Sequence, residues 1–143
     1  MEILIDTREQ RPLEFPRMET KRIKLSEGDY NVKELLPFVV IERKSLSDFY
    51  GSLTTGHRRF RDEIIRSRLQ GKTFYIFLEG NLQDFYKLSW SKRRIHMRIP
   101  QLVAMVETMI EKYQLIIIEC ESREKMSELI ISTININKKL YGA

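Results

Sequence analysis

The sequence predicts an α/β fold in which helices flank a mixed central sheet. Three observations support this prediction. Short apolar runs of strand length recur along the chain, stretches with helical periodicity separate the later runs, and the first strands precede the first helix. This order, strands first and then alternating helices and strands, is typical of a mixed sheet with helices on its faces.

The N-terminal part of the chain is expected to supply mainly strands. A short apolar strand covers 2–5 and ends at Asp6, and two prolines with many charges make 7–19 a loop. Residues 21–25 alternate polar and apolar side chains, which predicts an edge strand. The β-branched run at 38–41 predicts a buried central strand.

Two helices are expected in the middle of the chain. Ser45 is a good N-cap for a short helix that carries Leu46, Phe49 and Leu53. Residues 58–69 form a longer helix with one apolar stripe. The side chains of this stripe are Phe60, Ile64, Ile65 and Leu69.

The C-terminal part is expected to alternate strands and helices. Residues 73–78 and 115–119 are apolar strands, and Pro100 fits the first turn of a helix between them. Ser122 caps a last helix. The apolar stripes of these two helices are Leu102, Val106, Met109, Ile110 and Tyr113 in the first, and Met126, Leu129, Ile130, Thr133 and Ile134 in the second.

Composition limits the class of protein. A length of 143 residues predicts one domain over 1–143, and 42% apolar with 31% charged side chains exclude a disordered or fibrous chain. No apolar run is long enough to span a bilayer, and we expect no membrane partner and no secretory signal. The single Cys120 excludes an intramolecular disulfide framework and a cysteine-based zinc cluster. We therefore expect a reducing, intracellular setting.

The basic side chains are clustered. The net charge is +5, and residues 87–98 carry five Lys or Arg and no acid, with Trp90 among them. Residues 58–72 carry six more basic side chains. Two such clusters in one small domain fit a polyanion partner, although charge alone does not identify the polyanion. The basic side chains expected to contact a phosphate backbone are Arg58, Arg59, Lys92, Arg93 and Arg94.

A charged triplet ends the strand predicted at 38–41. Glu42 and Lys44 are two residues apart, so their side chains point to one face of the strand, and Arg43 points to the other. Such a triplet alone is most often a solvated strand end. Here it follows a buried run, so its charges need partners, and a divalent metal is one such partner.

Three further carboxylates are candidates for the same place. Asp29 lies 13 residues before Glu42, and a strand-loop-strand return of that length brings the two together; the alternative is a turn residue. Asp6 ends the first strand, where it is either a site residue or a loop cap. Asp48 either holds Lys44 or Arg43 or faces solvent. Converging carboxylates suit Mg²⁺ or Mn²⁺ and the hydrolysis of a phosphodiester.

The order of these motifs resembles a known family. Residues 28–29 followed by 42–48 resemble the G-D-x(n)-E-R-K-x-x-x-D signature of XPF/Mus-type structure-specific endonucleases. Residues 5–9 look like the first-strand motif of that family, and 56–63 are similar to the segment after the triplet. The resemblance covers residues 3–80 well and the rest by pattern.

The resemblance implies a restriction-endonuclease-like core. In such a core Asp29, Glu42 and Asp6 bind Mg²⁺ or Mn²⁺, with the backbone carbonyl of Arg43 alongside, and Lys44 is the general base or charge stabiliser. The active-site network is completed by Arg8, Glu9, Arg43 and Asp48.

It also implies branched DNA, such as flaps, forks or junctions, as substrate. Nuclease domains of this family commonly form homodimers or heterodimers. The apolar stripes of the two C-terminal helices exceed what one sheet face needs, so they are either such an interface or ordinary core. Tandem helix-hairpin-helix domains usually follow in the family, whereas this sequence is expected to be a stand-alone form.

Two other functions are considered. One is a catalytically silent DNA-binding or dimer-partner subunit, and the other is a four-way-junction resolvase. All of the acidic and lysine positions of the signature are present, which favours activity.

Overall fold

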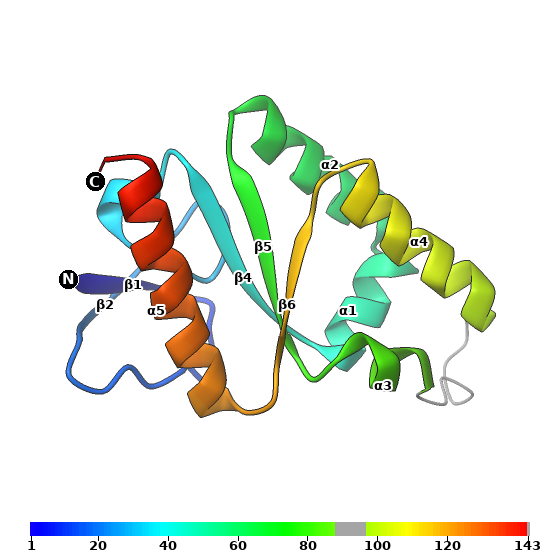
Figure 1. Ribbon diagram of the computed structural model, residues 1–143, viewed down its shortest axis with the longest axis horizontal. Helices are drawn as coiled ribbons and strands as arrows, with labels where there is room; N and C mark the ends of the chain where they lie inside the picture. Colours follow the sequence, from blue (N-terminus) through cyan, green and yellow to red (C-terminus); the bar gives the residue numbers. More distant parts are fainter. Residues whose placement is uncertain (88–96, 143) are drawn as a thin grey trace.

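The computed structural model describes residues 1–87 and 97–142. Its centre is one mixed sheet of six strands in the order β2-β1-β3-β4-β5-β6 (Figure 1). The pairs β1–β3 and β3–β4 are antiparallel, and the remaining neighbours are parallel. The strands are β1 (Glu2–Asp6), β2 (Glu19–Ile23), β3 (Tyr30–Asn31), β4 (Val39–Ser45), β5 (Thr73–Glu79) and β6 (Ile116–Cys120).

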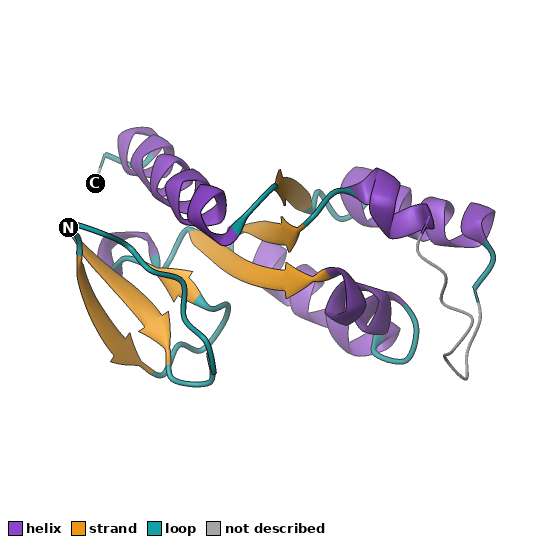
Figure 2. Ribbon diagram, turned by 90° about the horizontal axis from the view of Figure 1, so that it is seen from below, coloured by secondary structure: helices purple, strands orange, loops and turns teal. Residues whose placement is uncertain are grey.

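Helices cover both faces of the sheet. Helix α5 packs on one face, and α1 to α4 pack on the other, as the two views show (Figures 1 and 2). No helix of the described residues is long and apolar enough to cross a membrane. The helices are η1 (Lys33–Leu35, a 3-10 turn), α1 (Leu46–Leu53), α2 (His57–Leu69), α3 (Leu82–Lys87), α4 (Ile99–Glu111) and α5 (Arg123–Leu140).

Strand β4 separates two hydrophobic cores. Val39 and Ile41 point into the core beneath α5, whereas Val40 points into the core beneath α1, α2 and α4. All three side chains are buried, as expected of a central strand. The alternation continues past Ile41, and it therefore decides to which face each charged residue of the triplet points.

The α/β prediction and the order of its main elements are confirmed. The hydroxyl of Ser45 accepts the Asp48 N–H at 3.0 Å, and that of Ser122 accepts the Lys125 N–H at 3.1 Å, so both predicted N-caps are present. β4 is longer than expected and includes the whole triplet, because β5 pairs with it as far as Ser45.

The stripe predicted for the helix at 58–69 is wrong at its end. Leu69 is 84% exposed, whereas Ser67 is fully buried. The Ser67 hydroxyl donates to Glu27 at 3.1 Å, and Lys72 approaches the same carboxylate at 3.4 Å. A polar contact to the loop before Gly28 thus occupies the inner side of the last turn of α2, and Leu69 points outward.

Candidate active site

The charged triplet of β4 is divided between the two faces of the sheet. Lys44 Nζ lies 3.5 Å from Glu42 Oε2, and both side chains are largely buried. Arg43 points to the opposite face, where it contacts Glu9 and Glu79. The alternation expected from the sequence is therefore present, and it creates two chemically different surroundings on one strand.

Asp29 lies beside Glu42 because the chain returns between β3 and β4. The Asp29 N–H donates to the Ile41 carbonyl at 2.8 Å, and the Asp29 carbonyl accepts the Asp6 N–H at 2.8 Å. The Asp29 carboxylate accepts the Arg43 N–H, also at 2.8 Å. These bonds place Asp29 between the ends of β1 and β4, as the strand-loop-strand interpretation predicted.

Gly28 makes this close approach possible. Its φ is +75°, and a Cβ at this position would lie 2.7 Å from the Ile41 carbonyl oxygen and 3.0 Å from Val40 Cγ1. Any other residue would therefore be strained in conformation and would collide with the backbone of β4. The glycine before Asp29 is a structural requirement of the carboxylate pair.

The negative charges of Asp29 and Glu42 are only partly balanced by neighbouring cations and hydrogen-bond donors. Burial, with the neighbouring Glu42 carboxylate next in effect, raises the pKa of Asp29 to about 7. Burial likewise raises the pKa of Glu42 to about 7, even though Lys44 opposes the shift. Glu42 Oε2 is buried and has no hydrogen-bond partner among the described residues. Such an orphaned acceptor is costly unless another group pairs with it.

The donor set of this pair fits a hard divalent cation. Asp29 and Glu42 offer carboxylate oxygens, which are the ligands that Mg²⁺ and Mn²⁺ prefer. Within the described residues there is no group of three or more His, Cys, Asp or Glu side chains arranged for a metal. Any cation held here would therefore complete its coordination with backbone oxygen, substrate or water.

Asp6 is bonded to Asp29 through the backbone, but its carboxylate binds Arg8 and Leu25. Its Oδ2 accepts Arg8 Nε at 2.6 Å and the Arg8 N–H at 3.2 Å, and its Oδ1 accepts the Leu25 N–H at 2.8 Å. Burial alone would raise the pKa of Asp6, but the Arg8 side chain and these two N–H donors hold it below its ordinary value. Asp6 thus orders the loop after β1, and its expected role as a metal ligand remains a prediction.

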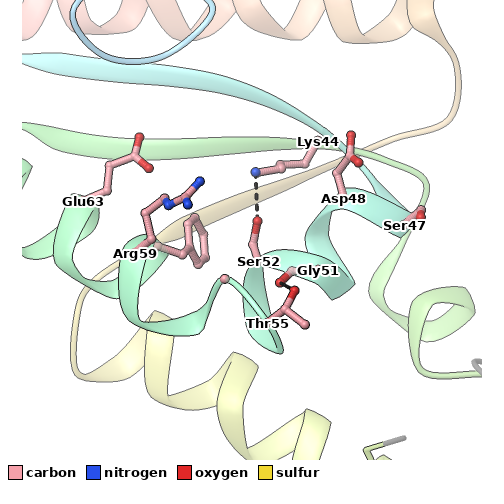
Figure 3. A pocket seen from close by; sticks show the side chains of 10 residues that line it. Lys44, Ser47, Asp48, Gly51, Ser52, Thr55, Arg59 and Glu63 are labelled. Carbon is pink, nitrogen blue, oxygen red and sulfur yellow. Dashed lines mark hydrogen bonds between the residues drawn. The ribbon is translucent and has the colours of Figure 1, made fainter. Parts of the chain in front are cut away.

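Lys44 faces a polar cavity of about 490 Å³. Its ammonium donates to Ser52 Oγ at 2.9 Å and lies 5.6 Å from the centroid of the Phe60 ring. Figure 3 shows Lys44 reaching across the cavity towards α1, with Arg59 and Glu63 of α2 on the far side. The other lining residues are Ser47, Asp48, Gly51, Thr55 and Gly56.

Asp48 stands at this cavity with an exposed side chain. Its backbone N–H completes the Ser45 cap, which fixes the start of α1 directly after the triplet. Arg43 is held by the carboxylates of Glu9 and Glu79. Of the alternatives considered for Asp48, the structure therefore shows the solvent-facing one and not a contact with Arg43.

The sequence analysis missed several residues of the site. Ser52, Glu63 and Glu79 contact or face the triplet from α1, α2 and β5. Burial raises the pKa of Glu63, with Lys44 opposing the shift. Glu63 follows Arg59 by four residues on one helical face, which is a usable signal. Glu79 ends a strand predicted to lie in the same sheet, but only the pairing of β4 with β5 shows that it reaches Arg43.

The predicted DNA contacts are only partly described. Arg58 and Arg59 lie in the first turn of α2 and are exposed, and Arg59 lines the cavity. Lys92, Arg93, Arg94 and Trp90 lie outside the described residues. The proposal of a second basic contact region therefore rests on the sequence.

The structure thus places a partly buried acidic pair and a lysine at the strand ends of an α/β domain. The family model of the ERCC4 domain matches residues 5–133, and the chain belongs to this family. The resemblance to XPF-type nuclease domains is thereby confirmed.

Two solved structures are similar in fold. XPF from Aeropyrum pernix superimposes with a TM-score of 0.73 at 23% identity, covering 96% of this chain and 65% of that chain. XPF from Aeropyrum pernix in complex with DNA gives a TM-score of 0.70 at 24% identity, with the same coverage. The chain thus spans less than two thirds of these relatives. The comparison with curated proteins gave no match.

Proposed function

We propose that residues 1–143 form one nuclease domain that hydrolyses phosphodiester bonds in branched DNA with the help of a divalent metal. The observation that carries this proposal is the pairing of two partly buried carboxylates, Asp29 and Glu42, with Lys44 Nζ 3.5 Å from Glu42. A purely structural acid pair would be expected to have its oxygens hydrogen-bonded, whereas Glu42 Oε2 has no hydrogen-bond partner among the described residues and only the Lys44 ammonium at 3.5 Å.

Asp29 and Glu42 would hold the cation, because their oxygens are hard ligands and their ionised forms need a positive neighbour. The carbonyl of Arg43 belongs to the same strand end and is the expected third protein ligand. A bound Mg²⁺ or Mn²⁺ supplies positive charge that polarises the phosphodiester and makes a water more acidic.

Lys44 supplies the second positive charge of the proposed site. Its ammonium is fixed by Ser52 Oγ at 2.9 Å and faces the cavity in which a phosphate group would lie. A cation held in advance of the reaction stabilises the negative charge that develops on the phosphate oxygens without reorganising. As an ammonium, Lys44 would act as the charge stabiliser. To act as general base it would have to be a neutral amine, whose lone pair accepts a proton from the attacking water.

DNA is the proposed polyanion. A similar solved structure, XPF from Aeropyrum pernix, contains DNA. In this chain Arg59 lines the cavity, the exposed Arg58 precedes it in the first turn of α2, and the sequence adds Lys92, Arg93 and Arg94. Arginine and lysine at such positions bind the phosphate backbone and carry no base preference. Selection of flaps, forks or junctions is therefore proposed to depend on DNA shape.

A homodimer or heterodimer through the C-terminal helices is also proposed. The inner stripe of α5 packs into the core of the domain, since Met126, Ile130 and Ile134 are fully buried, and it is not available to a partner. A partner could instead contact the apolar side chains that are exposed on α4 and α5. They are Ile99 and Ile110 on α4, and Ile136 and Leu140 on α5.

The test is cleavage of end-labelled flap, fork, four-way-junction, single-stranded and linear duplex DNA in Mg²⁺, Mn²⁺ or EDTA. We expect metal-dependent cutting of branched forms that disappears in Glu42→Ala. Cutting of the four-way junction alone would identify a resolvase. Tight binding with no cutting under any metal would contradict the nuclease proposal and support a silent DNA-binding subunit.

A further inference from the structure

Glu79 connects two arginines on the face of the sheet opposite the acidic pair. Its carboxylate accepts a hydrogen bond from Arg43 Nη1 and lies 3.5 Å from Arg123 Nη1. Glu79 ends β5, Arg43 lies near the end of β4, and Arg123 begins α5. One carboxylate thus ties two strand ends to the first turn of a helix.

The same network closes on the loop after β1. Arg43 Nε donates to Glu9 Oε2 at 3.0 Å, and Nη2 lies 3.3 Å from Oε1, which is a bidentate arrangement. The Tyr30 hydroxyl donates to Glu9 Oε2 at 2.7 Å. Arg123 Nη2 donates to the Arg11 carbonyl at 2.6 Å. Glu9, Arg43, Glu79 and Arg123 therefore form a ring closed by residues 9–11, which we call the charge ring.

The charge ring is directly bonded to the candidate metal site through one peptide group. The Arg43 N–H, which belongs to the peptide joining Glu42 to Arg43, donates to the Asp29 carboxylate at 2.8 Å. The Arg43 guanidinium donates from three nitrogens to the carboxylates of Glu9 and Glu79, which limits the rotation of the Arg43 backbone. The spacing of Asp29 and Glu42 then depends on the anchorage of Arg43 from the other face.

We propose that Glu79 is a positioning residue that acts through Arg43 to hold Asp29 and Glu42 at metal-binding distance, with Arg123 as its secondary support. This inference deepens the proposed function and rests on it for its chemical meaning. Glu79 matters more than Arg123 because it balances two guanidinium charges. Without it Arg43 keeps Glu9 and Arg123 keeps the Arg11 carbonyl, and the two guanidinium charges repel one another with no carboxylate between them.

The experiment compares Glu79→Ala and Glu79→Gln with the matched control Glu128→Ala. Glu128 also pairs with a cation, Lys125 Nζ at 3.2 Å, but both side chains are more than half exposed and lie on the outer part of α5. Three quantities are measured: hydrogen exchange of the Arg43 amide, Mn²⁺ binding to the DNA-free protein, and kcat and KM for cleavage.

In Glu79→Ala we expect the Arg43 amide to exchange about tenfold faster or more, while core amides of β5 keep their protection. Mn²⁺ affinity and kcat should each fall by about 10- to 100-fold, as is usual when the support of a metal ligand is removed. KM for DNA should stay unchanged, since Glu79 touches no proposed DNA contact. Glu79→Gln should lie between, and Glu128→Ala should match the parent protein.

Unchanged Arg43 exchange and Mn²⁺ affinity in folded Glu79→Ala would overturn the proposal, as would a rise in KM with kcat unchanged. If Glu79→Ala does not fold, Glu79→Gln and Arg123→Ala give the same readouts with a smaller perturbation. A parent protein that cuts no DNA, combined with faster Arg43 exchange in the variant, would defeat the nuclease function and keep the positioning role.

Discussion

The two faces of β4 near its C-terminal end differ in how completely their charges are satisfied. On one face, Glu42 has a buried oxygen without a hydrogen bond, and its partner Lys44 is 3.5 Å away. On the other face, Arg43 is held by Glu9 and Glu79 with direct hydrogen bonds. Adjacent residues of one strand thus lie in opposite electrostatic situations.

This difference indicates that the two faces of β4 have different roles: one is proposed to bind a cation, and the other supports the backbone. A site that is to bind a cation keeps carboxylates in an unfavourable state until the cation arrives, which lowers stability. The strain persists because the opposite face is saturated with hydrogen bonds and fixes the backbone. The following substitutions test each face separately.

The largest effect is expected on the poorly satisfied face. Glu42→Gln and Lys44→Ala should each lower cleavage by about 1,000-fold or more, because one removes a metal ligand charge and the other a phosphate-facing cation. DNA binding, measured by fluorescence anisotropy in Ca²⁺ or EDTA, should be largely retained. Cleavage within a few-fold of the parent in both variants would refute the site, and Glu128→Gln serves as the neutral control.

Glu9→Ala should have the largest effect on stability. The Glu9 side chain is only 9% exposed and accepts from Arg43 and Tyr30. Its removal leaves the partly buried Arg43 guanidinium with one carboxylate fewer, which we expect to cost about 3 kcal/mol in the free energy of unfolding. Urea denaturation measures this loss. A change below that of exposed Glu128→Ala would mean that the supporting face is not saturated.

Gly28→Ala should disturb the contact between the turn before Asp29 and the backbone of β4. The added Cβ meets the Ile41 carbonyl at 2.7 Å in a backbone of φ +75°, so we expect a loss of about 2 kcal/mol in the free energy of unfolding. Gly71→Ala is the matched control, since its φ is +77° but nothing lies within 4 Å of the new Cβ. Equal losses in both variants would show that φ alone matters.

The acidic pair should make stability depend on pH in the metal-free protein. The folded-state pKa values of Asp29 and Glu42 are raised to about 7 from ordinary values of 3.8 and 4.5, so the folded state binds more protons than the unfolded state between these limits. Stability should therefore fall as pH rises from about 5 to about 7, by about 1 kcal/mol per pH unit.

Thermal unfolding in EDTA across this range measures the slope, and Mn²⁺ should remove most of it by stabilising the ionised pair. Asp29→Asn combined with Glu42→Gln should flatten the dependence. A metal-free protein that becomes more stable from pH 5 to pH 7 would contradict the raised pKa values.

The smallest effect is expected at the first turn of α2. Neutralising Arg58 and Arg59 should weaken DNA binding and reduce the slope of log affinity against log salt by up to about 0.9 per lost phosphate contact. Lys138→Ala with Lys139→Ala, in the last turn of α5 on the other side of the sheet, is the charge-matched control. An identical slope in both pairs would place the DNA away from α2.

Local signals predicted the elements well, because hydrophobic periodicity and N-caps such as Ser45 act over a few residues. The division of Glu42, Arg43 and Lys44 between two faces followed from the strand period alone. Contacts such as that of Arg43 with Glu79 were not predictable, since they depend on which strands pair. The exposure of Leu69 was missed for the same reason: Glu27, forty residues from Ser67, decides which side of α2 turns inward.

The backbone of Asp29 bridges β1 and β4, because its carbonyl accepts the Asp6 N–H and its own N–H donates to Ile41. The candidate site is therefore assembled from segments that must first meet across a long stretch of chain, at the entropic cost of closing that loop. Strand β4 carries Glu42 and Lys44, whereas Asp29 comes from the turn before β3 and Asp6 from the end of β1. The acidic pair is therefore complete only where β3 has paired with both β1 and β4.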